Sequence, residues 1–189
     1  MPARPPTCRP DAAHAAPSDW AEGFAPVVDT RTRALVLGSM PGRASLARAA
    51  YYAHPRNAFW PLMRALFGVP AEGPIEARYP ALLAAGVGLW DVLGACHRPG
   101  SLDGAIRMAD AETRPLAALL DAHPRIHALA FNGATAARVF RQRIAPTLAP
   151  GRLAGLRLLA MPSTSPAHAS LDLAAKRAAW AALREALAG

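Results

Sequence analysis

Lysine and cysteine are almost absent from this chain of 189 residues, which has Lys176 as its only lysine and Cys8 and Cys96 as its only cysteines. Two thiols are too few for a disulfide framework, an iron–sulfur cluster or a cysteine-rich zinc site. No apolar run approaches the roughly 20 residues of a membrane-spanning helix, and the N-terminus lacks the apolar segment of a secretory signal. These absences favour a cytoplasmic enzyme or binding protein.

Acidic residues are also fewer than basic residues in this chain. The chain has 13 Asp and Glu residues against 21 Lys and Arg, so its formal net charge is +8. Two explanations fit: an Ala-, Arg- and Pro-rich composition typical of a GC-rich coding sequence, or an anionic partner, most simply nucleic acid. The positive residues form no block, so the sequence does not indicate a basic tail.

The hydrophobic content of 52% is enough for a sizeable core. Residues 1–20 are rich in Pro and Ala and predict a disordered or loosely docked arm, whereas residues 21–189 predict a single domain. Strands alternate with helices along that domain, which predicts a three-layer α/β/α fold with a central four-stranded, mostly parallel sheet. We expect strands at 34–38, 87–93, 126–131 and 156–161, and helices at 61–67, 75–85, 113–122, 134–142 and 173–187, with Thr113 as a helix cap.

The last helix has an apolar stripe at helical spacing, formed by Leu173, Trp180, Leu183 and Leu187. Lys176 is expected on the opposite, solvated face. A solvated lysine is a poor candidate for a nucleophile, so the sequence predicts no covalent amine chemistry.

Ligands of parallel α/β sheets bind outside the carboxyl ends of the strands. Four segments lie at such ends: 38–42, 91–96, 131–133 and 161–168. Each carries polar or turn residues directly after an apolar run, so we expect them to form the functional site.

The segment 51–60, YYAHPRNAFW, is dense in aromatic residues. Its rings, the Arg56 guanidinium and the Asn57 amide suit a flat, stacked ligand. A second interpretation is also open, in which Phe59 and Trp60 belong to the core and Asn57 caps a helix. Likewise, Asn132 before a glycine could offer one donor and one acceptor to a ligand, or simply form a turn.

Five motifs together resemble the uracil-DNA glycosylase superfamily, and most closely its hypoxanthine-DNA glycosylase (DNA-deoxyinosine glycosylase) branch. They are GSMPG at 38–42, YYAHPRNAFW at 51–60, GLWDVL at 88–93, FNG at 131–133 and PSTSPAHA at 162–169. The resemblance extends from about Phe24 to the C-terminus. It implies a four-stranded parallel sheet between helices and the excision of a deaminated base from DNA.

Two positions depart from the superfamily. Met40 stands where other branches carry an acid or amide that handles the attacking water, and Met161 stands where a histidine often stabilises the departing base. Asn57 is the candidate for the water, as the resemblance to the hypoxanthine branch also implies. The group that stabilises the departing base is left unassigned, because His168 lies seven residues after Met161 and could face the DNA instead.

The expected reaction flips the base out of the stack and hydrolyses its bond to the sugar. Phe59 would stack on the base, and Asn132 would bind its edge through two hydrogen bonds, in a pocket that includes Ser39 and Met40. Asn57 would orient the water for an oxocarbenium-like transition state. The residues expected to contact DNA are Gly42, Arg56, Ser163, Ser165 and His168. We expect a monomer that needs no metal or other cofactor.

Three alternatives stay open. Uracil presents the same edge pattern as hypoxanthine, so a uracil or mismatch-specific glycosylase of the same superfamily is one. A nucleic-acid-binding module without catalysis is the second. A serine hydrolase using Ser163 or Ser165 with His168 is the third, although the G-x-S-x-G turn of such enzymes is absent.

Overall fold

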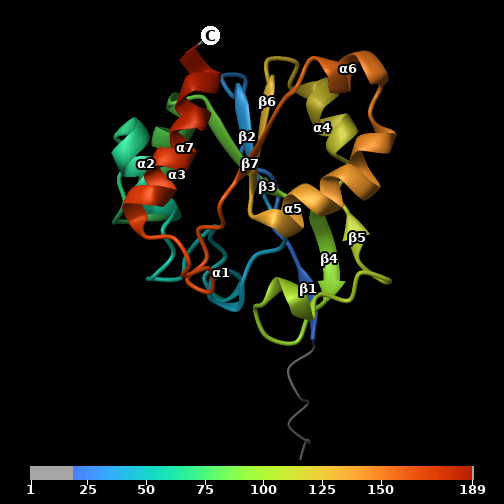
Figure 1. The fold of residues 1–189 in the computed structure, drawn as a ribbon, viewed down its shortest axis with the longest axis horizontal. Helices are drawn as coiled ribbons and strands as arrows, with labels where there is room; N and C mark the ends of the chain where they lie inside the picture. Colours follow the sequence, from blue (N-terminus) through green and yellow to red (C-terminus); the bar gives the residue numbers. More distant parts are fainter. Residues whose placement is uncertain (1–18, 189) are drawn as a thin grey trace, which may run out of the picture.

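The computed structural model describes residues 19–188, which contain a four-stranded parallel sheet between two layers of helices (Figure 1). The strand order is β3 (Val87–Asp91), β2 (Ala34–Gly38), β6 (Ala128–Asn132) and β7 (Arg157–Met161). This confirms the expected three-layer α/β/α class. The expected arm at residues 1–20 lies outside the described residues, apart from its last two positions.

Each face of the sheet is covered by helices. Helices α2 (Phe59–Phe67), α3 (Ile75–Ala84) and α7 (Leu173–Ala188) cover one face. The other face is covered by α4 (Leu116–Ala122), α5 (Ala134–Val139) and α6 (Pro150–Ala154). Strand β2 is buried throughout, because its alternate side chains pack into the two separate cores.

A smaller antiparallel sheet lies beside the parallel one and was not expected. It pairs β4 (Leu93–His97) with β1 (Trp20–Glu22) and β5 (Glu112–Thr113). The predicted strand 87–93 is therefore two strands, because the chain leaves the parallel sheet after Asp91. Thr113 belongs to β5 and does not cap a helix, since α4 begins at Leu116.

The remaining short elements connect these layers. They are α1 (Arg43–Ala47), η1 (Asp103–Ala105), the π-helical turn η2 (Phe140–Ile144) and η3 (Ala145–Thr147). Within the described residues, no helix combines the length and the apolar character needed to cross a bilayer.

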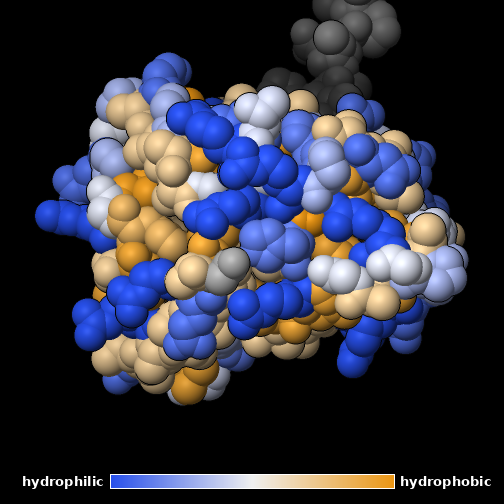
Figure 2. Space-filling model, turned by 90° about the horizontal axis from the view of Figure 1, so that it is seen from above, coloured by the Kyte–Doolittle hydropathy of each residue, from blue (hydrophilic) through white to orange (hydrophobic). Residues whose placement is uncertain are grey.

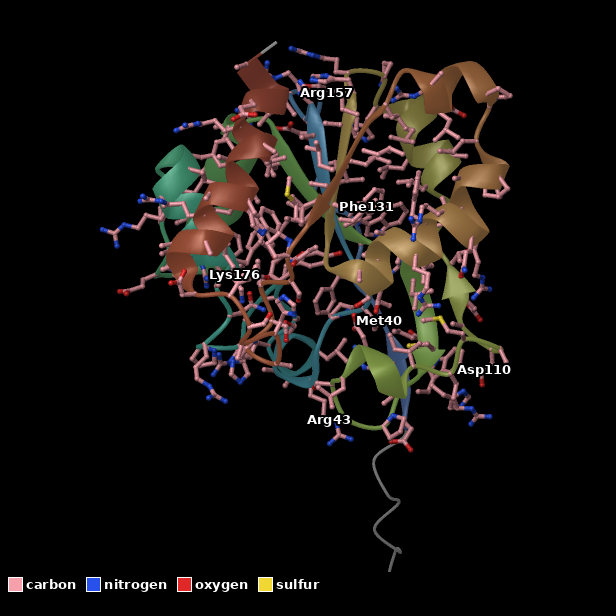
Figure 3. The ribbon with its side chains drawn as sticks, in the orientation of Figure 1. Met40, Arg43, Asp110, Phe131, Arg157 and Lys176 are labelled. Atoms are coloured by element: carbon pink, nitrogen blue, oxygen red, sulfur yellow. The ribbon has the colours of Figure 1, made fainter. Side chains whose placement is uncertain are left out.

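The expectation for Lys176 was wrong. Its side chain is only 5% exposed and lies on the inward stripe with Trp180, Leu183 and Leu187, whereas Leu173 is 51% exposed. The Lys176 Nζ donates a hydrogen bond to the carbonyl oxygen of His168 at 2.8 Å, so the carbon stem can pack against the core while the ammonium reaches a polar partner (Figure 3).

Candidate active site

A cleft of ≈ 380 Å³ opens at the carboxyl ends of the parallel strands. All four strand-end segments that the sequence singled out contribute to its lining, through residues 38–42, Asp91, 132–133 and 163–168. The segment 51–57 and the loop 101–103 complete the wall. Residues from six separate parts of the chain therefore meet at one edge of the sheet.

The loop after β2 is held by a buried arginine. Arg98 donates hydrogen bonds to the backbone oxygens of Met40, at 3.2 Å, and Pro41. Met40 and Gly42 both line the cleft. Gly38 has no room for a side chain, because a Cβ there would lie 2.4 Å from Oδ1 of Asp91. This loop is therefore a fixed wall rather than an adaptable one.

Ser39 is buried and turned toward a carboxylate. Its hydroxyl donates a hydrogen bond to Oδ1 of Asp103 at 2.6 Å, and both residues line the cleft. Asp103 comes from η1, in a loop that carries no recognisable motif. Sequence reasoning therefore missed this carboxylate and had no signal that could have found it.

Tyr51, Tyr52 and His54 line the cleft from their segment, whereas Phe59 does not. Phe59 is fully buried and is not part of the cleft wall, which corrects the expectation that it lies directly against a ligand. Tyr52 stacks on Phe59 with ring centroids 4.0 Å apart and an interplanar angle of 24°. Its backbone has a φ of +55°, an unusual conformation for a residue with a Cβ and one that is enriched at functional sites.

Asn57 lines the cleft just before α2, and its side chain also bonds to the first residue of that helix. Its Oδ1 accepts a hydrogen bond from the Phe59 backbone N–H at 3.0 Å, which satisfies one free donor of the helix. An amide oxygen has two lone pairs, so one stays available. Among the described residues, none accepts a hydrogen bond from the Asn57 Nδ2, whose two N–H groups are also available.

The amide of Asn132 is engaged with Thr164. Asn132 Nδ2 donates to the Thr164 hydroxyl, and its Oδ1 accepts from the Thr164 backbone N–H, each at 2.9 Å. These two bonds occupy the amide edge that was expected to bind a base. Asn132 keeps only one further N–H and one further lone pair, so the predicted two-bond contact with a base does not match this arrangement.

The loop 162–168 is anchored by α7. Trp180 Nε1 donates to the Pro162 carbonyl oxygen at 3.0 Å, in addition to the bond from Lys176 to His168. Thr164 also accepts a hydrogen bond from the Ala58 backbone N–H at 3.0 Å. The loop is thus fixed relative to both α7 and the start of α2, where Asn57 lies.

Ser163, Ser165 and His168 line the cleft as that loop passes its mouth. The Ser163 hydroxyl accepts from the Ser165 backbone N–H at 3.2 Å, and His168 Nε2 lies 3.3 Å from the Ser170 hydroxyl. The His168 backbone N–H donates to the Ser165 carbonyl oxygen at 3.0 Å, but among the described residues no hydrogen bond joins the His168 ring to the hydroxyl of Ser163 or Ser165, so the geometry does not favour a serine hydrolase. Arg56 is exposed and lies outside the cleft wall.

Asp91, at the end of β3, is a buried carboxyl group in the cleft wall, only 3% exposed. Burial raises its pKa to about 7, since Arg114 and Arg98 only partly offset the loss of solvent and Asp103 acts in the same direction as burial. Sequence reasoning included Asp91 in a motif but assigned it no role. The available signal was a carboxylate directly after an apolar run at a strand end.

Arginines lie both at the cleft edge and on the opposite face of the molecule. Arg43 is exposed at the cleft edge (Figure 3). The opposite face, at the amino ends of the strands, is also covered largely by hydrophilic residues (Figure 2), and Arg157 lies there. Within residues 19–188, no group of three His, Cys, Asp or Glu side chains is arranged to hold a metal ion.

Known proteins similar to this chain are DNA glycosylases. The model of the uracil DNA glycosylase superfamily matches residues 25–184. Hypoxanthine DNA glycosylases of Methanosarcina barkeri and Methanosarcina acetivorans are 38% and 35% identical over 113 and 112 residues, which is 59% of this chain and 70% of each relative. The solution NMR structure of a presumed uracil DNA glycosylase from Methanosarcina acetivorans matches with a TM-score of 0.73 at 28% identity, over 90% of this chain and 99% of that one.

Proposed function

Because this chain belongs to the uracil DNA glycosylase superfamily, we propose that it removes a deaminated base from DNA, and that the base is hypoxanthine. Two relatives that are more than one-third identical carry the name hypoxanthine DNA glycosylase. The observation that carries the proposal is the Asn57 amide in the cleft, with a free lone pair and free N–H groups.

Asn57 orients the attacking water in this proposal. A neutral amide is no strong base, but its oxygen can accept a hydrogen bond from water and hold it in place. That suits a dissociative route, in which the bond to the sugar breaks first and an oxocarbenium-like centre captures the positioned water. The DNA phosphates supply negative charge near that centre.

The flipped base enters beside Tyr52, whose ring replaces Phe59 as the proposed aromatic contact. Met40 supplies an apolar wall, and Ser39 a polar one. Asn132 contributes to the base pocket chiefly by fixing Thr164 and the loop that follows.

The mouth of the cleft contacts the DNA backbone. Hydroxyl, imidazole and guanidinium groups are suitable donors to phosphate oxygens. The residues proposed for this contact are Gly42, Arg43, Ser163, Ser165 and His168, with Arg56 on the adjoining surface.

Water is the proposed nucleophile, and the enzyme is monofunctional. A strand-nicking glycosylase would need an amine that reaches the sugar. Lys176 is buried, but it is not part of the cleft wall and its ammonium is held by the His168 carbonyl oxygen.

The test is base release from matched duplexes that contain deoxyinosine, deoxyuridine, deoxyxanthosine or ethenodeoxyadenosine, followed by alkali. We expect free hypoxanthine and an alkali-labile abasic strand, with Asn57→Ala as the inactive control. Release of uracil alone would show that the protein is a glycosylase whose substrate base is uracil and not hypoxanthine. DNA binding with no release from any duplex would refute the proposal in favour of a binding module.

A further inference from the structure

Two buried polar atoms in the cleft wall have no hydrogen-bond partner among the described residues. They are Oδ2 of Asp91 and the hydroxyl oxygen of Tyr52. Other buried side-chain atoms without a partner belong to residues outside the cleft wall: Arg78, Arg98, Asp110 and Arg114. Buried polar groups are normally paired, so these two atoms are candidates to pair with a bound ligand or a water molecule, although the Asn132 amide also lies close enough to the Tyr52 hydroxyl to act on its pKa.

The two groups lie next to each other across Gly38. A Cβ at Gly38 would be 2.4 Å from Oδ1 of Asp91 and 3.5 Å from the Tyr52 hydroxyl, so these two oxygens are at most about 6 Å apart. One planar base could therefore contact both. The absence of a side chain at Gly38 is what leaves room for the Asp91 carboxyl group beside Tyr52.

The charges around Asp91 allow it to be neutral. Arg98 follows β4 and Arg114 follows β5, and both favour the carboxylate; Asp103, from η1, favours the acid. The Tyr51 hydroxyl also favours the carboxylate, as the smallest of these influences, and the Asp91 charge in turn raises the pKa of Tyr51, Tyr52 and Tyr79. Burial outweighs the two arginines, so a proton is held on Asp91 up to near-neutral pH.

We propose that Asp91 donates its carboxyl proton to the base as the glycosidic bond breaks, while the Tyr52 hydroxyl hydrogen-bonds to the same base. This proposal rests on the function proposed above. The electron pair of the C1′–N9 bond moves into the purine, the proton from Asp91 adds to N7, and hypoxanthine leaves as a neutral molecule. Water adds to C1′ and releases a proton to solvent, from which the Asp91 carboxylate is reprotonated.

This assignment gives Asp91 the task of stabilising the departing base. A histidine often has that task in the superfamily that this chain resembles, but the chain has Met161 at the corresponding position. An uncharged purine is a better leaving group than a purine anion, and general acids of this kind typically contribute about 10² to 10⁴ in rate. A carboxyl group with a pKa near the working pH is suited to this task, because it can both hold and release its proton.

The experiment measures single-turnover hypoxanthine release by the full-length protein between about pH 5.5 and pH 8.5. For the wild type we expect a rate that falls at least about tenfold as pH rises through the upper half of this range. Asp91→Asn keeps the shape of the side chain and can still donate a hydrogen bond, but it cannot transfer a proton. Its rate should be about a hundredfold lower near pH 6 and should not fall further with pH.

A second substrate separates proton transfer from a structural role. 7-Deazadeoxyinosine lacks the N7 acceptor, so the wild type should release its base much more slowly than hypoxanthine, whereas the two substrates should differ far less for Asp91→Asn, which loses only a hydrogen bond. Asp110→Asn is the matched control, because Asp110 pairs with His97 at 2.8 Å outside the cleft (Figure 3), and it should behave as the wild type.

The outcomes are distinguishable. If the wild type releases hypoxanthine and Asp91→Asn matches its rate and pH profile, the role of Asp91 is refuted while the function stands. A slower Asp91→Asn that keeps the wild-type pH slope and the full sensitivity to N7 would also refute proton transfer, in favour of a structural effect. If the wild type releases no base at all, the proposed function and the role of Asp91 fall together.

Discussion

Asp91→Asn should change how the stability of this protein depends on pH. The Asp91 carboxyl group has a pKa of about 7 in the folded protein, against 3.8 in an unfolded chain, because burial disfavours its charged form. Between those two values the folded protein holds a proton that the unfolded chain has released. The free energy of unfolding must therefore fall as pH rises through this window, and level off above about pH 7.

The size of the effect follows from the same two pKa values. Inside this window the free energy of unfolding falls by about 1.36 kcal/mol for each pH unit. From about pH 5 to pH 8 the wild type should therefore lose about 2 to 3 kcal/mol that Asp91→Asn does not lose. For a domain of this size, 1 kcal/mol shifts the melting temperature by about 2 to 4 °C, so the difference should amount to at least about 5 °C.

Urea unfolding of both proteins at several pH values measures this directly. The informative quantity is the difference in free energy of unfolding between variant and wild type at each pH, because the contributions of all other titratable groups are common to both proteins. Asp110→Asn serves as the control, because that carboxyl group is about one-third exposed and lies outside the cleft. Parallel curves for Asp91→Asn and the wild type would refute the argument, since they would mean that Asp91 is ionised in the folded protein.

Four further predictions concern the reaction and the DNA contact. Asn57→Ala should lower single-turnover base release by at least about tenfold with little change in DNA affinity, because it removes the group that holds the water; unchanged release by the folded variant would move that role to another residue. Gly38→Ala should also slow base release, since its methyl group would collide with Asp91, and a normal rate would mean that base release does not depend on the position of Asp91. The logarithm of DNA affinity should fall linearly with the logarithm of salt concentration, and a flat dependence would mean that the positive charge is compositional only. Borohydride should trap no protein–DNA adduct, and an adduct that disappears in Lys176→Met would contradict water as the nucleophile.

The sequence by itself predicted the architecture well where local rules decide structure. Strands β2 and β6 are short apolar runs, and such runs are stable only when both faces of a strand are covered, which requires helices on each side. Gly68 follows the predicted helix 61–67 and ends α2 in the left-handed conformation, at φ +71°, which glycine adopts without strain. The convergence of strand ends into one cleft followed from the parallel topology, because parallel strands bring their carboxyl ends to the same edge.

Local rules failed where the environment of a side chain comes from distant segments. Spacing alone assigned Lys176 to solvent, whereas the His168 carbonyl oxygen gives its ammonium a partner at the edge of the core. No residue near Asn132 in the sequence indicated a partner for its amide. Thr164, which is 32 residues away, nevertheless hydrogen-bonds to both its Nδ2 and its Oδ1.

The chemistry of the cleft was decided in the same way. The sequence determined that Asn57 and Asp91 stand at the ends of regular elements near one edge of the sheet. Only the tertiary structure decided that Tyr52 covers Phe59, that Asp103 reaches Ser39, and that Asp91 is buried with an unpaired oxygen. The physical reason is that burial, and with it the charge state of a carboxyl group, depends on every segment packed around that group, and these segments meet only when the chain has folded.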